Sequence, residues 1–488
     1  MSLSQLGASK SVPDGLSGRA ARGGVLTIGG QAGRVLIQFL GLVVLSRILP
    51  PESFGVYAVV AAVFALGELL RDFGLTNAAI RSEHLSRRTA SNVFWLSLVI
   101  GTALALLVAL AALALFVSGG ASDLSLALAL LGFCFFINAA QSIYQILLVR
   151  GLRFGALALT DVTSQIIGLA VAILTALSGF GLWSLMAQLF AISATLLGAR
   201  ILAVQWIPSW PSRDPSIKPM LGFGANVAGA QVLGYVANNA DTFSLSVLQG
   251  PVTLGFYSRA FQLLTVPMNQ ILSPLTNVFL PILSQAAGDR QRFSGAIQRT
   301  LFTVGLPSLT LLIIMSTQAN AIVSIALGEQ WRPSSGVLAI LAIGGCFQVF
   351  GFAGFWVFLS AGLGSELLRY NLLTKPLTAV LVATGASLGA EGAASGYALG
   401  LFLSWPLCYL WLAKRGHAPV VPAFRSSAVL TLSGILAFLV GFVLASATAQ
   451  LPLIISLLIG AAGVFVSLVG SLMAWPLGRI GLADSIRT

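Results

Sequence analysis

Long apolar stretches, separated by short polar gaps, recur along this sequence from residue 24 to about residue 476. A bilayer core about 30 Å thick is spanned by a helix of roughly 20 apolar residues. With 57% hydrophobic and 8% charged residues, the chain predicts an all-α integral membrane protein, because a transmembrane β-barrel would show alternating segments of about ten residues. We expect about fourteen membrane-spanning helices, at 24–49, 54–70, 89–117, 125–149, 155–177, 183–204, 221–248, 254–283, 300–326, 335–360, 370–388, 392–412, 426–446 and 453–475.

Positive charge is concentrated in every second gap between these stretches. Of the 26 Lys and Arg residues, 21 lie in alternate gaps or in the two terminal segments, counting Arg200 at the edge of one gap as a loop cation. Lys and Arg are retained on the cytoplasmic side of short loops, so we expect both termini in the cytoplasm. Because the cations are spread over many loops and form no basic domain, the net charge of +12 does not indicate nucleic-acid binding.

A proline-rich segment divides the predicted helices into two groups. It contains four prolines between Pro208 and Pro219, which is typical of a semi-rigid linker. A weak repeat supports the division, since the pattern of residues 46–57 recurs at 246–257. We therefore predict a cytoplasmic tail (1–23), an N-lobe of six helices (24–205), a cytoplasmic linker (206–220), a C-lobe of six helices (221–412), and two further helices with a cytoplasmic tail (413–488).

Three cations lie inside predicted helices, five or more residues from either end. Arg34 lies ten residues into the first, roughly 15 Å along it at 1.5 Å per residue, and shares a helix face with Gln31 and Gln38. An arginine at this depth needs a wet cavity or an ionic partner. Substrate contact and a structural ion pair within the lobe therefore both remain open for Arg34.

The second and third intramembrane cations belong to the predicted C-lobe. Arg259 lies about five residues into the eighth predicted helix, with Gln262 one turn further. Lys375 precedes Pro376 near the start of the eleventh. Each either faces a cavity or extends its charged end to the nearer membrane surface.

Three acidic residues are the intramembrane counterparts of these cations. Asp241 follows Asn238 and Asn239 on the seventh predicted helix and is a candidate for coupling to an ion gradient, or for an ion pair with a neighbouring helix. Asp161 and Glu68 are candidates for the same two roles.

The sequence also lacks the motifs of an enzyme or a metal site. The spacing of these three acidic residues does not match a dedicated metal site, and the chain has no Walker A motif and no large loop for an enzymatic domain. We therefore expect no enzymatic activity, metal or cofactor.

Several motifs carry a resemblance to a known family. They lie at residues 45–57, 71–81, 239–241, 254–260, 279–285 and 327–332. Together they resemble the Wzx-type and colanic-acid-exporter-like polysaccharide exporters of the MOP superfamily, which also contains the multidrug (MATE) exporters and the lipid II flippase. The resemblance implies two six-helix lobes forming a V around a central cavity, in a bacterial inner membrane.

The resemblance also implies a function. Such a protein would flip an undecaprenyl-pyrophosphate-linked oligosaccharide from the cytoplasmic to the periplasmic leaflet by alternating access, and a polymerase or co-polymerase of the pathway would be a partner. Cavity arginines on the first and eighth helices matter in the lipid II flippase, which favours Arg34 and Arg259 as pyrophosphate contacts. The alternatives are a MATE-like, ion-coupled antiporter of small cationic compounds and a non-transporting scaffold.

Overall fold

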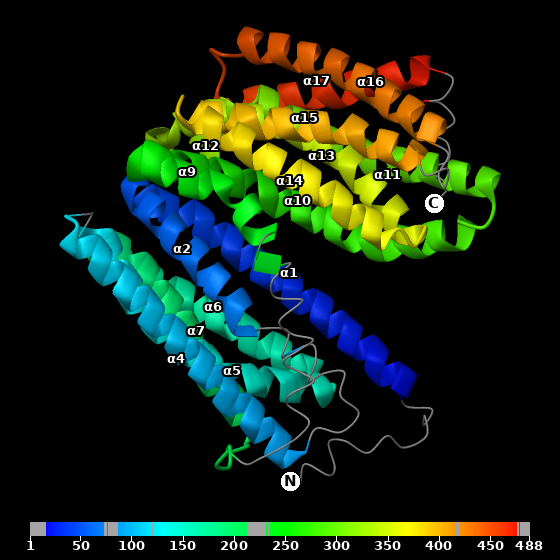
Figure 1. The fold of residues 1–488 in the computed structure, drawn as a ribbon. Helices are drawn as coiled ribbons and strands as arrows, with labels where there is room; N and C mark the ends of the chain where they lie inside the picture. The colour runs from blue at the N-terminus through cyan, green and yellow to red at the C-terminus, as the bar shows by residue number, and fades with distance from the viewer. Residues whose placement is uncertain are drawn as a thin grey trace. The chain divides into compact units, whose positions relative to one another are not determined.

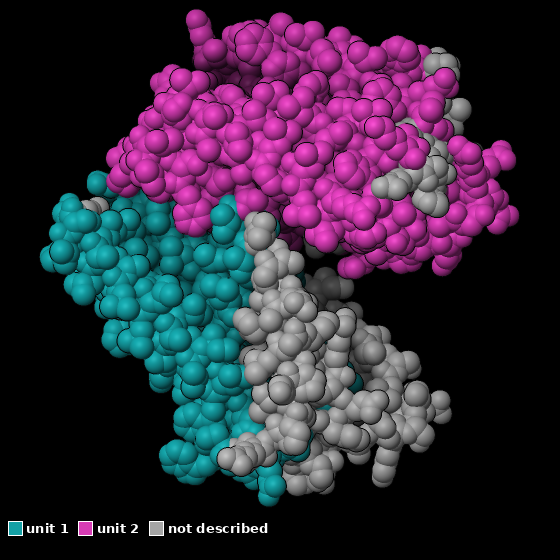
Figure 2. Space-filling view, viewed as in Figure 1, with its two compact units in different colours: residues 1–236 teal, residues 237–488 magenta. Residues whose placement is uncertain are grey.

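The computed structural model describes residues 16–72, 76, 86–119, 122–211, 231–232, 234–414, 420–475 and 478. All regular elements in these ranges are helices (Figure 1). The chain forms two compact units, residues 1–236 and 237–488, which Figure 2 shows in teal and magenta. The unit boundary lies after the proline-rich segment, so the domain limits predicted around 206–220 stay predictions.

The first unit contains six long helices. They are α1 (Leu16–Ile48), α2 (Pro51–Asp72), α4 (Arg87–Val117), α5 (Ser122–Arg150), α6 (Phe154–Leu177) and α7 (Leu182–Val204). Helix α4 packs on α5, α6 packs on α7, and α1 runs along α6. Small residues allow α1 and α6 to approach closely: a Cβ atom added to Gly30 of α1 would lie 2.6 Å from the Cβ of Ala158 on α6. Close contact through small residues is typical of helices that associate within lipid.

The second unit is built around α13. Its elements are α9 (Ala240–Leu248), α10 (Gly250–Ala286), α11 (Arg290–Thr317), α12 (Ala319–Ala326), a 3₁₀ turn (Glu329–Trp331), α13 (Ser334–Ser360), α14 (Gly364–Ala386), α15 (Ala390–Lys414), α16 (Val420–Ala447) and α17 (Leu453–Ala474). Helix α13 contacts α10, α11 and α15, and its Trp356 and Phe358 are fully buried. Helices α16 and α17 pack against α11, so the two helices predicted after the C-lobe belong to this unit.

Apolar surface faces outward from the helices, as a lipid environment requires. Eleven of the described helices are long and apolar enough to cross a membrane; α10 and α14 are long but more polar, and the total of fourteen spans stays a prediction. On α4, more than half of the surface of each of six large side chains is exposed: Val99, Leu106, Leu107, Leu110, Leu113 and Phe116. The prediction of an all-α integral membrane protein is confirmed.

Several predicted helix ends are wrong, each because polar residues inside a helix resemble a loop. The helix predicted at 300–326 begins ten residues earlier and is divided at Gln318 into α11 and α12. The helix predicted at 370–388 begins at Gly364, because Arg369 pairs with Glu366 at 2.9 Å within its first turns. The predicted tail 1–23 includes the start of α1 at Leu16.

The predicted linker and seventh helix are described only in part. Residues 205–211 are non-helical, and Trp206 packs edge-on against Tyr144 of α5. The backbone NH of Ser209 donates to the Ser91 hydroxyl of α4 at 3.0 Å. The rest of the linker, and residues 221–230 of the predicted seventh helix, lie outside the described residues.

Candidate functional site

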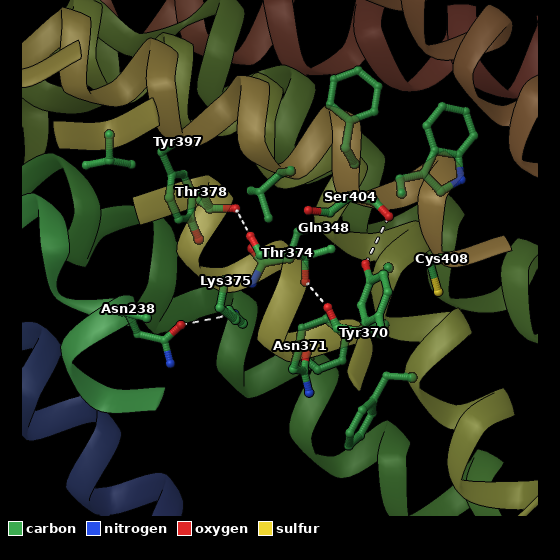
Figure 3. A pocket seen from close by; sticks show the side chains of 18 of the residues that line it. Asn238, Gln348, Tyr370, Asn371, Thr374, Lys375, Thr378, Tyr397, Ser404 and Cys408 are labelled. Carbon is green, nitrogen blue, oxygen red and sulfur yellow. Dashed lines mark hydrogen bonds between the residues drawn. The ribbon is translucent and has the colours of Figure 1, made fainter. Parts of the chain in front are cut away.

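A cavity of about 610 Å³ lies within the second unit. Its walls come from α10, α13, α14 and α15 and from the chain around the start of α9 (Figure 3). The lining mixes aromatic rings, side-chain amides and hydroxyls with one lysine and one aspartate. Pockets of roughly 300–1,000 Å³ that combine apolar walls with a few polar groups are typical small-ligand sites.

The helix leading into α9 is interrupted at the edge of this cavity. Residues 234–238 are helical, Asn239 is a turn, and α9 begins at Ala240. Asp241 in the first turn of α9 is buried, with 6% of its surface exposed, and the Thr242 backbone NH donates to its carboxylate at 2.7 Å. Interrupted helices within a membrane characteristically line substrate and ion sites of transporters.

Asp241 also has two tyrosine neighbours. Tyr257 of α10 and Tyr397 of α15 both lie close enough to interact electrostatically with its carboxylate. Asp241 forms no ion pair with any residue that the structure describes. The predicted ion pair to a neighbouring helix and the predicted coupling role both stay predictions.

Lys375 occupies the middle of α14 and faces the cavity. It is the twelfth of 23 residues in this helix, because the helix begins earlier than predicted. Its Nζ donates to Asn238 Oδ1 at 3.0 Å, across the cavity edge (Figure 3). The interpretation as a cavity cation fits this position better than a lysine that extends from a helix end to the membrane surface, and its role stays a prediction.

Aromatic side chains form much of the cavity wall. The rings of Phe261 and Tyr397 meet edge to face at 5.7 Å, and those of Phe347 and Trp405 stack at 5.9 Å. The Tyr370 hydroxyl donates to the Ser404 carbonyl at 2.9 Å. Because their neighbours hold these rings in place, the cavity has preformed walls.

Arg259 and Gln262 lie on α10 but do not line this cavity. Since α10 begins at Gly250, Arg259 is its tenth residue and lies about 14 Å from the helix start. Its surface is only 9% exposed, which does not fit a side chain that extends to the membrane surface. A pyrophosphate contact by Arg259 stays a prediction.

Arg34 lies on α1 directly after Gly33, where an added Cβ would lie 3.7 Å from Val162 of α6. Its side chain is half-buried, whereas Gln31 and Gln38 are exposed. The Nε atom of Arg34 is buried without a hydrogen-bond partner, and the described residues include no ionic partner for it. Substrate contact stays a prediction, and the alternative of a structural ion pair within the N-lobe also stays a prediction.

Two ion pairs in the first unit account for the remaining predicted acids. Glu68 accepts two hydrogen bonds from the guanidinium of Arg71, at 3.2 and 2.9 Å. Asp161 of α6 pairs at 2.7 Å with Arg200 of α7, whose side chain is 4% exposed. For Asp161 the alternative of bonding between helices fits the structure. The role of Glu68 in coupling is untested.

Arg200 belongs to a polar network that the sequence did not identify. Its guanidinium also donates to Gln141 and, at 3.1 Å, to Gln145. Gln141 in turn donates to Asn138, which donates to Ser193 at 2.8 Å. The network links α5, α6 and α7 inside the first unit. Asn138, Gln141 and Gln145 share one face of α5 at spacings of three and four residues, which was the available signal.

The cavity also contains residues missed at the sequence level. They are scattered over α13, α14 and α15, and they include Gln348, Tyr370, Asn371, Thr374, Thr378, Tyr397, Ser404 and Trp405. No short motif connects them, because neighbours across a helical cavity are far apart in the chain. Among the described residues, no group of three or more His, Cys, Asp or Glu side chains could hold a metal ion.

Comparisons with known proteins match most of the chain. A family model described as polysaccharide biosynthesis protein matches residues 44–336. The succinoglycan biosynthesis transport protein ExoT of Rhizobium meliloti is 26% identical over 313 residues, which are 64% of this chain and 63% of ExoT, less than two thirds of its length. The lipopolysaccharide biosynthesis protein WzxC of Escherichia coli is 22% identical over 392 residues, 78% of each chain.

Solved structures share the fold. The lipid II flippase MurJ in an inward closed conformation superposes with a TM-score of 0.70 and 14% identity, covering 91% of this chain and 98% of MurJ. An inward-facing multidrug MATE transporter of the MOP superfamily gives a TM-score of 0.56 and 15% identity, and the match covers 80% of this chain and 96% of the transporter. The predicted MOP-type fold is confirmed.

Proposed function

Because this chain belongs to the polysaccharide biosynthesis protein family, we propose that it is a flippase for a lipid-linked polysaccharide repeat unit. The carrier would be undecaprenyl pyrophosphate, moved from the cytoplasmic to the periplasmic leaflet of a bacterial inner membrane by alternating access. The alternating positive charge of the gaps supports an orientation with both termini in the cytoplasm. A polymerase or co-polymerase would take the product.

The observation that carries the proposal is the cavity in the second unit. A multi-pass membrane protein needs such a lining only if a polar molecule enters the membrane interior, since polar groups exposed to lipid are costly. Aromatic rings, amides and hydroxyls match a saccharide, which presents hydroxyl groups and apolar ring faces. A cationic drug would be repelled by Lys375, the one cation among the described residues of the lining, and this disfavours the antiporter alternative.

Arg34 is our candidate for the pyrophosphate contact. Its guanidinium is partly buried and lacks an ionic partner among the described residues, so an anionic group would offset the cost of an arginine within the membrane. Arg34→Gln should reduce flipping about tenfold or more, since hydrogen bonds between charged groups are the strong ones. Arg34→Lys should retain part of the activity. Arg47→Gln, on the same helix but exposed near its end, is the matched control.

The test is reconstitution in liposomes that contain an undecaprenyl-pyrophosphate-linked saccharide. A membrane-impermeant oxidant of sugars then reports the fraction of lipid in the outer leaflet with time. We expect fast equilibration with the wild-type protein and slow equilibration in protein-free vesicles. Equal rates in both would overturn the proposal, and efflux of a cationic dye in place of lipid flipping would favour the antiporter.

A further inference from the structure

One ammonium group faces the cavity of the second unit from its wall. Lys375 is the only Lys or Arg among the described lining residues, and its side chain is exposed to the cavity. An ammonium has three donors, and the hydrogen bond to Asn238 uses one of them. Two donors therefore remain for a ligand.

The negative charge of Asp241 does not neutralise this ammonium through an ion pair. Asp241 is buried, and its carboxylate accepts from the backbone NH of Thr242. The partner of Lys375 is the neutral amide of Asn238. A lysine inside the membrane with only a neutral partner is costly, and an anionic ligand group would offset that cost with a strong, charge-assisted hydrogen bond.

The rest of the lining indicates which anion fits. Ring faces carry partial negative charge, which attracts the weakly positive C–H groups on the flat side of a sugar. Tyr397 and Tyr370 supply such rings, and the amides of Gln348 and Asn371 can bond sugar hydroxyls. A pyrophosphate, with several negative charges and no apolar face, would need more cations and would leave these rings unused.

We propose that this cavity binds an acidic sugar of the repeat unit, such as a uronic acid, whose carboxylate pairs with Lys375. The proposal rests on the flippase function above and adds the substrate class. The volume of about 610 Å³ accommodates a short saccharide and not a long chain. The cavity would therefore recognise one end of the unit.

Binding to the purified full-length protein tests this inference by calorimetry. The probes are glucuronosyl-glucose, its neutral counterpart cellobiose, and inorganic pyrophosphate. We expect the wild-type protein to bind the acidic disaccharide about tenfold more tightly than the neutral one. Lys375→Gln should abolish this preference and Lys375→Arg should keep it. Arg292→Gln, at an arginine with a side chain 83% exposed and outside the cavity, is the matched control and should bind like the wild type.

A second variant keeps the test decisive if Lys375→Gln folds poorly. Asn371→Asp places a carboxylate four residues before Lys375 on α14, where it can pair with the ammonium, and it should remove the acidic preference as well. An unchanged preference in a folded Lys375→Gln protein would overturn the inference, as would tighter binding of pyrophosphate that depends on Lys375.

Flipping assays separate this inference from the function on which it rests. The wild-type protein should flip a carrier with an acidic saccharide faster than one with a neutral saccharide. Equal flipping of both would refute the acidic-sugar site alone. Flipping of neither would refute the proposed function.

Discussion

The pair of Asp161 and Arg200 provides the sharpest test of how the first unit is stabilised. Arg200 has a side chain only 4% exposed, and its one ionic partner among the described residues is Asp161 at 2.7 Å. Asp161→Leu would leave a buried guanidinium with only the amide oxygens of Gln141 and Gln145. Breaking a buried ion pair by removing one partner costs about 3–5 kcal/mol.

The expected cost is smaller here because the protein does not fully enclose the pair. The Asp161 side chain is 30% exposed, so we expect Asp161→Leu to lower the free energy of unfolding by about 2–3 kcal/mol. The double variant Asp161→Leu with Arg200→Met removes both charges. It should cost less than the sum of the two single variants, with a coupling energy of about 1–2 kcal/mol.

Unfolding by sodium dodecyl sulfate in mixed micelles measures these differences. Additive effects of the two single variants would refute the reasoning, since they would mean that the pair does not interact. Flipping in liposomes separates a structural from a coupling role. A folded Asp161→Asn protein that still responds to an imposed proton gradient excludes Asp161 as the coupling group.

Two further predictions concern packing in the second unit. A Cβ atom on Gly396 would lie 2.2 Å from the Leu381 carbonyl oxygen, so Gly396→Ala must separate α14 from α15 and should cost about 1–3 kcal/mol. Gly351→Ala, where no heavy atom lies within 4 Å of the added Cβ, should be neutral or stabilising. Trp331 is fully buried, and Trp331→Ala should cost about 3–5 kcal/mol. The same change at Trp475, which is 43% exposed, should cost much less. Thermal unfolding in detergent ranks all four, and equal effects within either pair would contradict the assigned packing.

The sequence predicted the helical membrane fold well because lipid imposes a simple rule on each helix. A stretch of apolar residues of sufficient length is enough to identify a span. The rule fails where polar residues bond to one another inside the protein. Arg200 was counted as an orienting loop cation, yet it lies near the end of α7 and pairs with Asp161. Hydropathy does not distinguish a buried, paired arginine from one at the membrane surface.

The candidate site was predicted only where charge made a residue conspicuous. Asp241 and Lys375 were identified because charges are rare within apolar helices, and both line the cavity. Tyr370, Tyr397 and Trp405 were not identified, because aromatic residues are common throughout membrane helices. Their meaning depends on which helices meet, and a single sequence does not contain that information.

The break between α11 and α12 has a consequence for how the chain is made. The side-chain amide nitrogen of Gln318 at this break is buried without a hydrogen-bond partner. Helix α17 covers it so closely that a Cβ atom added to Gly460 would lie 1.9 Å from it. A ribosome delivers α17 well after α11 and α12, so in the growing chain this amide stays uncovered until α17 is made. A chain that stops before α17 would leave this polar group without its cover in the bilayer. We expect cellular quality control to recognise and degrade such truncated chains, which makes the hairpin of α16 and α17 a checkpoint for biogenesis of the second unit.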